Sequence, residues 1–380
     1  MSHQLKSITR TALAVSITAC FAGPALAAGS LEDRVKELEM RLSSSSHSSG
    51  AAWAEKTTFG GYGELHLNQL NNKKPSGIDK DEIDFHRFVL FMGHEFNDRL
   101  RLHSELEVEH SLVEGDSGAV ELEQAYLDFT LNDTLSAKAG MFLVPVGITN
   151  ETHEPPTFYG VERNPVENKI IPTTWSEGGV GLTARLSDGF TLDGTITSGL
   201  ATSATDSYKV RDGRRNVAQA PAKDPAYTAR LKWAAIPGVE LGGSVQHQAD
   251  ITQSADATAG SARFYEVHTV INKGQFGLKA LYARWNLDGS GPKAVGADKQ
   301  NGWYIEPAWK FSEQWGVFAR QSNWDNQAGD TTDSKYSQTD VGVNYWPHPD
   351  VVVKLDFQNQ KSPVNKDEFD GFNVGVGYQF

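Results

Sequence analysis

The strongest indication of the fold of this chain is the nine-residue stretch Phe372-Asn373-Val374-Gly375-Val376-Gly377-Tyr378-Gln379-Phe380. Apolar side chains occupy every second position, and small or polar residues lie between them. Because successive side chains of a β-strand point to opposite faces, this period of two predicts a strand with one apolar and one polar face. Such a strand suits a wall between lipid and water, and the alternative is an edge strand of a soluble sandwich.

The N-terminal residues predict that the chain is exported. Residues 1–10 are basic, residues 11–23 form an apolar run, and residues 24–27 (Pro-Ala-Leu-Ala) provide small side chains for cleavage. We therefore expect residues 1–27 to be a secretory signal peptide that is cut after Ala27. A competing lipoprotein box ends at Cys20, which would then be acylated. The cut after Ala27 leaves no cysteine, so no disulfide would support the fold.

The composition favours a β-barrel over a helical membrane protein. Mean hydropathy is −0.44, and no other segment has 18 consecutive apolar residues, which excludes helical membrane spans. An exported chain that is rich in glycine and aromatic residues fits a barrel, because only alternate residues of each strand face lipid. The net charge of −13 opposes nucleic-acid binding.

The last strand resembles the closing strand of bacterial outer-membrane barrels. Its residues Phe372, Tyr378 and Phe380 are similar to the aromatic signal that the barrel-assembly machinery reads in such proteins. The resemblance implies that the chain is a multi-pass protein of the bacterial outer membrane. Its partners would then be outer-membrane lipid and the assembly machinery.

Turn signals set the predicted number of strands. Short signals lie at 97–98, 132–133, 187–189, 237–238, 273–274, 312–314 and 347–350, where the residue types favour hairpins. Longer polar stretches lie near 70–81, 111–119, 144–178, 200–225, 250–261, 287–300, 326–335 and 361–370. Seven short turns and eight long loops join sixteen strands. The sequence thus predicts an all-β fold in which residues 51–380 form a 16-stranded antiparallel transmembrane barrel.

A short amphipathic helix is expected within residues 28–50. Its apolar residues Leu31, Val35, Leu38 and Leu42 follow heptad spacing, with charged residues between them. Because so short a helix is marginal alone, we expect it to associate as a parallel trimeric coiled coil. The alternative is a frayed helix without a partner. The serine-rich residues 43–50 would be a flexible tether to the barrel.

The lumen-facing residues follow from the alternation along each strand. Basic and acidic candidates are nearly equal in number, with acids concentrated at 105–109 and bases spread over the later strands. Opposed acidic and basic walls would set a transverse field, whereas the alternative is that mixed charges merely solvate a wide channel. The predicted pore-lining residues are Arg101, His103, Glu105, Glu107, Glu109, Lys138, Arg185, Arg230, Lys232, Lys310 and Arg320.

A block around residues 139–181 carries a family resemblance. Residues 139–147 (Ala-Gly-Met-Phe-Leu-Val-Pro-Val-Gly) leave the fifth predicted strand, and Glu162-Arg163, Trp175 and the glycine-rich residues 178–181 follow. The block resembles the phosphate-selective porin O and P family. The resemblance implies a homotrimeric porin whose loop 144–178 folds into the lumen, with a constriction formed by Glu151, His153, Glu154, Glu162 and Arg163. Family members often carry a lysine between the phenylalanine and the proline, where this chain has Leu143 and Val144, so the resemblance does not extend to phosphate specificity.

We expect an outer-membrane porin through which small hydrophilic solutes or ions diffuse, without enzymatic reaction or cofactor. An outer-membrane hydrolase is a weaker alternative, because no Gly-x-Ser-x-Gly elbow or His-Glu-x-x-His pair occurs. His103 and Glu105 on one strand face, and His153-Glu154 in the loop, pair imidazole with carboxylate as a divalent-metal surface would, but no tight ligand spacing appears, so no metal ligand is assigned. The remaining alternatives are a phosphate- or anion-selective channel and a barrel scaffold that anchors or sheathes a periplasmic or surface partner.

Overall fold

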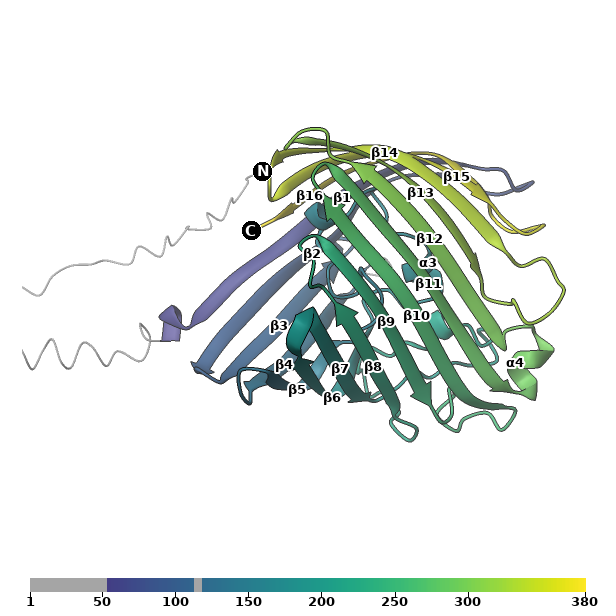
Figure 1. The fold of residues 1–380 in the computed structure, drawn as a ribbon. Coiled ribbons are helices and arrows are strands. Elements are labelled where there is room, and N and C mark those ends of the chain that lie inside the picture. The colour runs from purple at the N-terminus through teal and green to yellow at the C-terminus, as the bar shows by residue number, and fades with distance from the viewer. Residues whose placement is uncertain (1–52, 113–117) are drawn as a thin grey trace, which may run out of the picture. The chain divides into compact units, whose positions relative to one another are not determined.

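The computed structural model describes residues 53–112 and 118–380, which contain sixteen strands in one closed antiparallel barrel (Figure 1). The strands are β1 (Thr57–Asn72), β2 (Lys80–Asn97), β3 (Leu100–Glu109), β4 (Val120–Thr130), β5 (Leu135–Leu143), β6 (Ser176–Arg185), β7 (Phe190–Thr197), β8 (Ala226–Trp233), β9 (Val239–Gln248), β10 (Ala259–Lys273), β11 (Phe276–Gly289), β12 (Lys299–Trp309), β13 (Trp315–Asp325), β14 (Tyr336–His348), β15 (Val351–Lys361) and β16 (Phe369–Gln379). The predicted signal peptide, coiled coil and tether lie outside the described residues.

The last strand closes the barrel, and the predicted strand number is confirmed. Each strand pairs with the next in the chain, and β16 pairs with β1 so that Leu65 lies opposite Val376. The backbone N–H of Phe380 donates to the carbonyl of Gly61 at 2.9 Å, and the N–H of Gly61 donates to the carbonyl of Phe380 at 3.0 Å. The amphipathic stretch that led to the prediction is therefore the seam of the barrel.

The connections alternate between short turns and long loops at the predicted places. At one short turn, the side chain of Asn132 accepts hydrogen bonds from the backbone N–H groups of Thr134 and Leu135, both at 3.0 Å. At another, Gly238 has a φ of +76°, which a residue with a Cβ rarely adopts. Local features such as these end one strand and start the next, which is why the turns could be predicted from the sequence.

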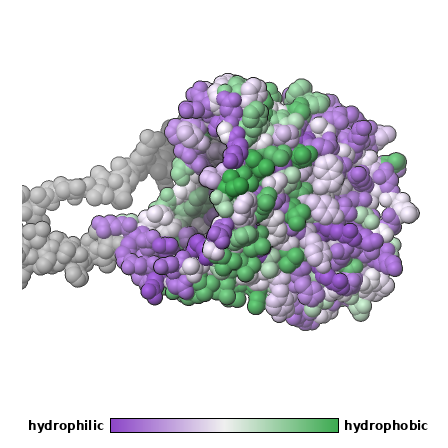
Figure 2. Space-filling view, viewed as in Figure 1, coloured by the Kyte–Doolittle hydropathy of each residue, from purple (hydrophilic) through white to green (hydrophobic). Residues whose placement is uncertain are grey.

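The two faces of the wall have opposite polarity. On β15, Val353 and Leu355 are exposed on the outside, whereas Lys354 and Asp356 point inward and are buried. Figure 2 shows apolar residues gathered in the middle of the visible outer face, with hydrophilic residues on either side. Aromatic residues lie near the strand ends, as in the pair Trp315 and Tyr345, whose ring centroids are 4.4 Å apart. No helix among the described residues is long and apolar enough to span a membrane.

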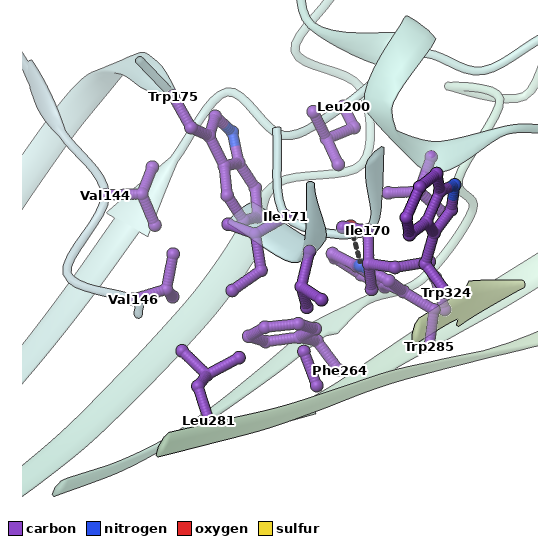
Figure 3. Packing of buried hydrophobic residues seen from close by; sticks show 14 of the residues in the cluster. Val144, Val146, Ile170, Ile171, Trp175, Leu200, Phe264, Leu281, Trp285 and Trp324 are labelled. Carbon is purple, nitrogen blue, oxygen red and sulfur yellow. Dashed lines mark hydrogen bonds between the residues drawn. The ribbon is translucent and has the colours of Figure 1, made fainter. Parts of the chain in front are cut away.

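A cluster of buried hydrophobic residues joins the loop between β5 and β6 to the inner face of strands β10–β13 (Figure 3). Ile170, Ile171 and Trp175, from the loop between β5 and β6, pack against inward-facing wall residues such as Phe264 and Trp285. All five side chains are at most 1% exposed. Burial of a large apolar side chain stabilises a fold by roughly 1.5–3 kcal/mol, so this cluster anchors the loop to the wall. Strand alternation alone did not predict apolar residues on the inner face.

Candidate functional site

The loop at 144–175 is closed at its base and has a defined shape. The N–H of Val144 donates to the carbonyl of Trp175 at 2.8 Å, where the chain leaves β5 and returns to β6. Asn150 bridges the same two residues, because its amide donates to the carbonyl of Val144 and its side-chain oxygen accepts from the N–H of Trp175. The loop contains a short 3-10 turn, η1 (Pro155–Thr157), and a single helical turn, α3 (Val166–Lys169).

Glu167 organises this loop from its centre. Its carboxylate is 3% exposed and accepts hydrogen bonds from the backbone N–H groups of Ile148 and Thr149 and from the hydroxyl of Tyr304 on β12. Gly147 has a φ of +69°, and a Cβ there would lie 2.5 Å from a Glu167 oxygen. A glycine is thus required at position 147 of the predicted strand exit, both by the backbone conformation there and by the close approach of Glu167.

The loop lies inside the barrel. The N–H of Val161 donates to the inward carboxylate of Asp356 on β15 at 2.6 Å, and a Cβ on Gly375 of β16 would lie 3.1 Å from the Val161 side chain. A Cβ on Gly377 would lie only 2.2 Å from Pro155. The glycines on the polar face of the last strand therefore make room for the inward loop.

A second loop, 198–225, also reaches across the interior, which sequence reasoning missed. It carries the short 3-10 helix η3 (Val210–Gly213). At one side, Gln300 of β12 donates to the carbonyl of Tyr208 at 2.7 Å. At the other, Asn216 donates to Glu121 of β4 at 2.7 Å. These contacts join residues about a hundred positions apart, so no local pattern in the sequence could have indicated them.

The two loops and strands β1–β3 enclose a polar cavity of about 340 Å³, which we call the eyelet. Its wall residues are Glu64, His66, His86, Arg87, Glu107, Glu109 and His110; its loop residues are Phe158, Val161, Glu162, Arg163, Asn168, Thr173, Thr174, Arg211 and Arg214. Of the predicted residues, only Glu107, Glu109, Glu162 and Arg163 line this cavity. The missed arginines, Arg211 and Arg214, come from the second loop.

The charged groups of the eyelet wall are paired with one another. Arg87 donates to Glu64 at 2.6 Å and lies 3.9 Å from Glu107. His66 is 3.2 Å from Glu162, so the loop is tied to β1 by an imidazole–carboxylate contact. Partial burial acts to raise the pKa of Glu162, but the neighbouring His66 outweighs it and holds the pKa well below its usual range.

Two loop arginines have no carboxylate within ion-pair distance among the described residues. Arg163 donates to the hydroxyl of Thr174 at 3.0 Å, and Arg214 donates to the carbonyls of Thr173 and Thr174. Burial, with the nearby Arg87 charge, lowers the pKa of Arg163 to about 10, so it remains cationic at neutral pH. Within the described ranges, neither guanidinium group is therefore neutralised by a direct ion pair.

The other predicted constriction residues lie elsewhere along the loop. Glu151 forms an ion pair with Arg230 of β8, which also lies 2.8 Å from Asp193 of β7. His153 and Glu154 lie beside the carboxylates of β3 and β4. His153 is 3.8 Å from Glu123 of β4, and Glu154 interacts electrostatically with Glu105 of β3. The five residues therefore meet three different parts of the wall.

Most predicted basic wall residues have local partners. Arg320 lies 3.0 Å from Asp340 and 3.2 Å from Glu306, and Lys232 lies 3.7 Å from Glu240.

Other basic wall residues lie over aromatic rings or near the short turns. The ammonium group of Lys138 lies over the ring of Phe142, and that of Lys310 lies over the ring of Trp346. The remaining predicted wall residues lie toward the short turns, where Arg101 pairs with Glu95 and where His103 and Arg185 are exposed. Most of these basic residues thus lie beside a carboxylate or an aromatic ring.

Comparisons with known proteins agree with this architecture. The sequence model of the family "Phosphate-selective porin O and P" matches residues 60–380. An uncharacterized protein from Aquifex aeolicus (strain VF5) is 28% identical over 363 residues, covering 85% of this chain and 80% of the relative.

Solved structures share the fold at low sequence identity. The anion-selective porin from Comamonas acidovorans has a TM-score of 0.59 at 13% identity, covering 85% of this chain and 99% of that chain. OmpT of Vibrio cholerae, folded in vitro and in trimer form, has a TM-score of 0.53 at 11% identity, with coverage of 85% and 99%.

Proposed function

Because this chain belongs to the phosphate-selective porin O and P family, we propose that its outer-membrane channel conducts small hydrophilic solutes and ions through the eyelet with weak ion preference. The family and the solved neighbours are channels rather than enzymes.

The balance of charge in the eyelet carries this proposal. Four arginines and four glutamates line the cavity. Three of the glutamates come from strands β1 and β3, whereas three of the arginines come from the two inward loops. Charges of opposite sign on facing sides set a transverse field, which orients dipolar solutes without strongly excluding ions of either sign.

The reversal potential of the purified protein in a planar bilayer under a KCl gradient tests the proposal, repeated with added phosphate. A value near zero or a weak cation preference, without block by phosphate, is expected. A strong preference for one ion would contradict the balance of charges. A folded barrel without any conductance would instead support the scaffold alternative.

An anion-selective channel is the second candidate, favoured by arginines that form no ion pair with a carboxylate in the part of the chain that the structure describes. Arg163 and Arg214 are of this kind. Arg211 lines both the eyelet and a second cavity of about 610 Å³, whose lining includes the bases Lys169, Lys209 and Lys366 and the acids Asp212, Asp333 and Asp367. Strong anion preference with phosphate block would favour this candidate.

The oligomeric state that we propose is a homotrimer. The heptad residues Leu31, Val35, Leu38 and Leu42 would form a parallel coiled coil, and the Vibrio cholerae OmpT structure is a trimer. Light scattering of the detergent-solubilised protein should give three copies, and Leu38→Asp should lower the share of trimer. A monomeric wild-type protein would contradict this assignment.

Export through a cleaved signal peptide is the remaining proposal. Mass spectrometry of the mature protein should find Ala28 as the first residue. A mature chain that begins at an acylated Cys20 would show that the lipoprotein box is used instead.

A further inference from the structure

We propose that Glu105, Glu123 and His153 bind one divalent transition-metal ion, Zn²⁺ or Mn²⁺, where the inward loop 144–175 meets strands β3 and β4. Glu105 lies on β3, Glu123 on β4 and His153 on the loop. One carboxylate oxygen from each glutamate and one ring nitrogen of the histidine lie within 4.8 Å of one another. This site is distinct from the conduction path proposed above and would fasten the loop to the wall.

The separation of the ligand atoms suits a shared ion better than a direct hydrogen bond. His153 Nε2 lies 3.8 Å from Glu123 Oε2, which is beyond hydrogen-bond distance. Imidazole nitrogen and carboxylate oxygen each bind Zn²⁺ at about 2.0–2.2 Å, so two ligands of one ion lie roughly 3–4 Å apart.

The environment of the Glu123 carboxylate points to a bound cation. It is 3% exposed, and neither of its carboxylate oxygens has a hydrogen-bond partner among the described residues. Glu105 Oε2 and Glu154 Oε2 are likewise buried without a hydrogen-bond partner. An unpaired buried carboxylate is strongly disfavoured, and several together are more so.

The nearby basic side chains do not supply a direct partner for these carboxylates. Arg87 is already bonded to Glu64 at 2.6 Å. Arg163 forms its hydrogen bond with Thr174 instead. A divalent ion would give the three ligands the direct contacts with a cation that no basic side chain among residues 53–112 and 118–380 provides.

His153 is oriented as metal-binding histidines are. Its Nδ1 lies 3.1 Å from the carbonyl oxygen of Asn150, so the proton belongs on Nδ1 and the lone pair of Nε2 points toward Glu123. A hydrogen bond from the second ring nitrogen to a backbone carbonyl commonly fixes the ring of a ligating histidine. Asn150 also closes the base of the loop through its side-chain hydrogen bonds, so the residue that orients His153 also fixes the shape of the loop.

The donor set indicates the class of metal. Ca²⁺ and Mg²⁺ favour sites made of oxygen ligands, whereas an imidazole together with carboxylates suits Zn²⁺, Mn²⁺ and related ions.

A second cluster provides a matched control. Asp84, His86 and His110 also place their ligand atoms within 4.8 Å of one another. There, however, the Asp84 carboxylate already lies 2.8 Å from His110 Nδ1 and 3.4 Å from His86 Nδ1. This cluster is held together by hydrogen bonds of its own.

Calorimetric titration of the full-length, detergent-folded protein with Zn²⁺, Mn²⁺ and Ca²⁺ after EDTA treatment tests the site. Wild type should bind one equivalent of Zn²⁺ or Mn²⁺ and prefer both to Ca²⁺. Glu123→Gln and His153→Asn should weaken that binding by about 100-fold or more, since loss of even an outer hydrogen-bond partner costs roughly 10–100-fold. His110→Asn should leave it unchanged.

Three results would overturn the proposal. They are a wild-type protein that binds neither Zn²⁺ nor Mn²⁺, a Glu123→Gln variant that retains wild-type affinity, or a His110→Asn variant that abolishes binding. Heat-modifiable migration on gels shows whether each variant is folded. Glu105→Gln replaces a less buried ligand and is expected to weaken binding in the same way, which keeps the test decisive if Glu123→Gln does not fold.

Discussion

The interior of this barrel has an apolar side and a charged side, and the same loop contacts both. On the apolar side, Ile170, Ile171 and Trp175 pack against wall residues of β10–β13. On the charged side, Glu162 and Arg163 line the eyelet beside β1–β3. A polar loop can therefore keep its position inside an aqueous channel, because apolar burial fixes one face of the loop while the other face sets the field in the pore.

The largest expected effect comes from breaking the apolar side. Trp285→Ala removes a fully buried ring and its 3.0 Å hydrogen bond to the carbonyl of Ile170. Truncation of a buried aromatic residue costs about 3–5 kcal/mol, so the loop should detach from the wall. Single-channel recording should show a larger and noisier conductance, and thermal unfolding should begin at lower temperature.

A matched variant separates anchoring of the loop from loss of a tryptophan. Trp303→Ala removes an outward ring that is 40% exposed on β12, and it should leave conductance unchanged. If Trp285→Ala also conducts like wild type, the apolar cluster does not hold the loop in place.

The second-largest effect on channel noise is expected at Glu167, a buried carboxylate in the same loop. Glu167→Gln replaces a carboxylate that accepts from Ile148, Thr149 and Tyr304 with an amide that has one acceptor fewer. An unsatisfied buried group costs about 1–3 kcal/mol, so the loop should fluctuate more and the open-channel noise should rise.

A smaller change at the same site provides a comparison for the Glu167→Gln variant. Tyr304→Phe removes only the 2.9 Å hydroxyl bond and should have an effect of about 1 kcal/mol or less. Equal noise in the two variants would mean that the backbone bonds to Glu167 contribute nothing to the shape of the loop.

The sequence was sufficient for the wall and for part of the site. Strand number and faces depend on local signals, which are turn residues such as Asn132 and the alternation seen on β15, and both were confirmed. The pairing of Arg230 with Glu151 depends instead on strand register and loop path, which no local pattern encodes. For the same reason Arg214 was missed, because the sequence indicated residues 200–225 only as a long polar loop.

Ion preference provides the third test, on the charged side. Arg163→Gln together with Arg214→Gln removes two positive charges that have no carboxylate partner among the described residues. The reversal potential should move toward cation preference, by an amount that shrinks as salt screens the remaining charges. Arg320→Gln is unsuitable as a comparison because it would break buried ion pairs, so Arg101→Gln, at an exposed site near a short turn, serves as the control.

The smallest expected effect is the response to acid at the contact between Glu162 and His66. The folded-state pKa of Glu162 lies below its unfolded value of about 4.3, so its stabilising contribution is complete above that pH and is lost as the pH falls through the folded-state pKa. Channel noise should therefore stay constant from pH 7 to about pH 5 and rise only in stronger acid. Glu162→Gln should show the raised noise already at pH 7, because the neutral amide cannot form the ion pair with His66. A wild-type channel whose noise changes near pH 6 would show that another group controls the loop on this side, whereas a flat response in both proteins would mean that the apolar side alone is sufficient to hold it.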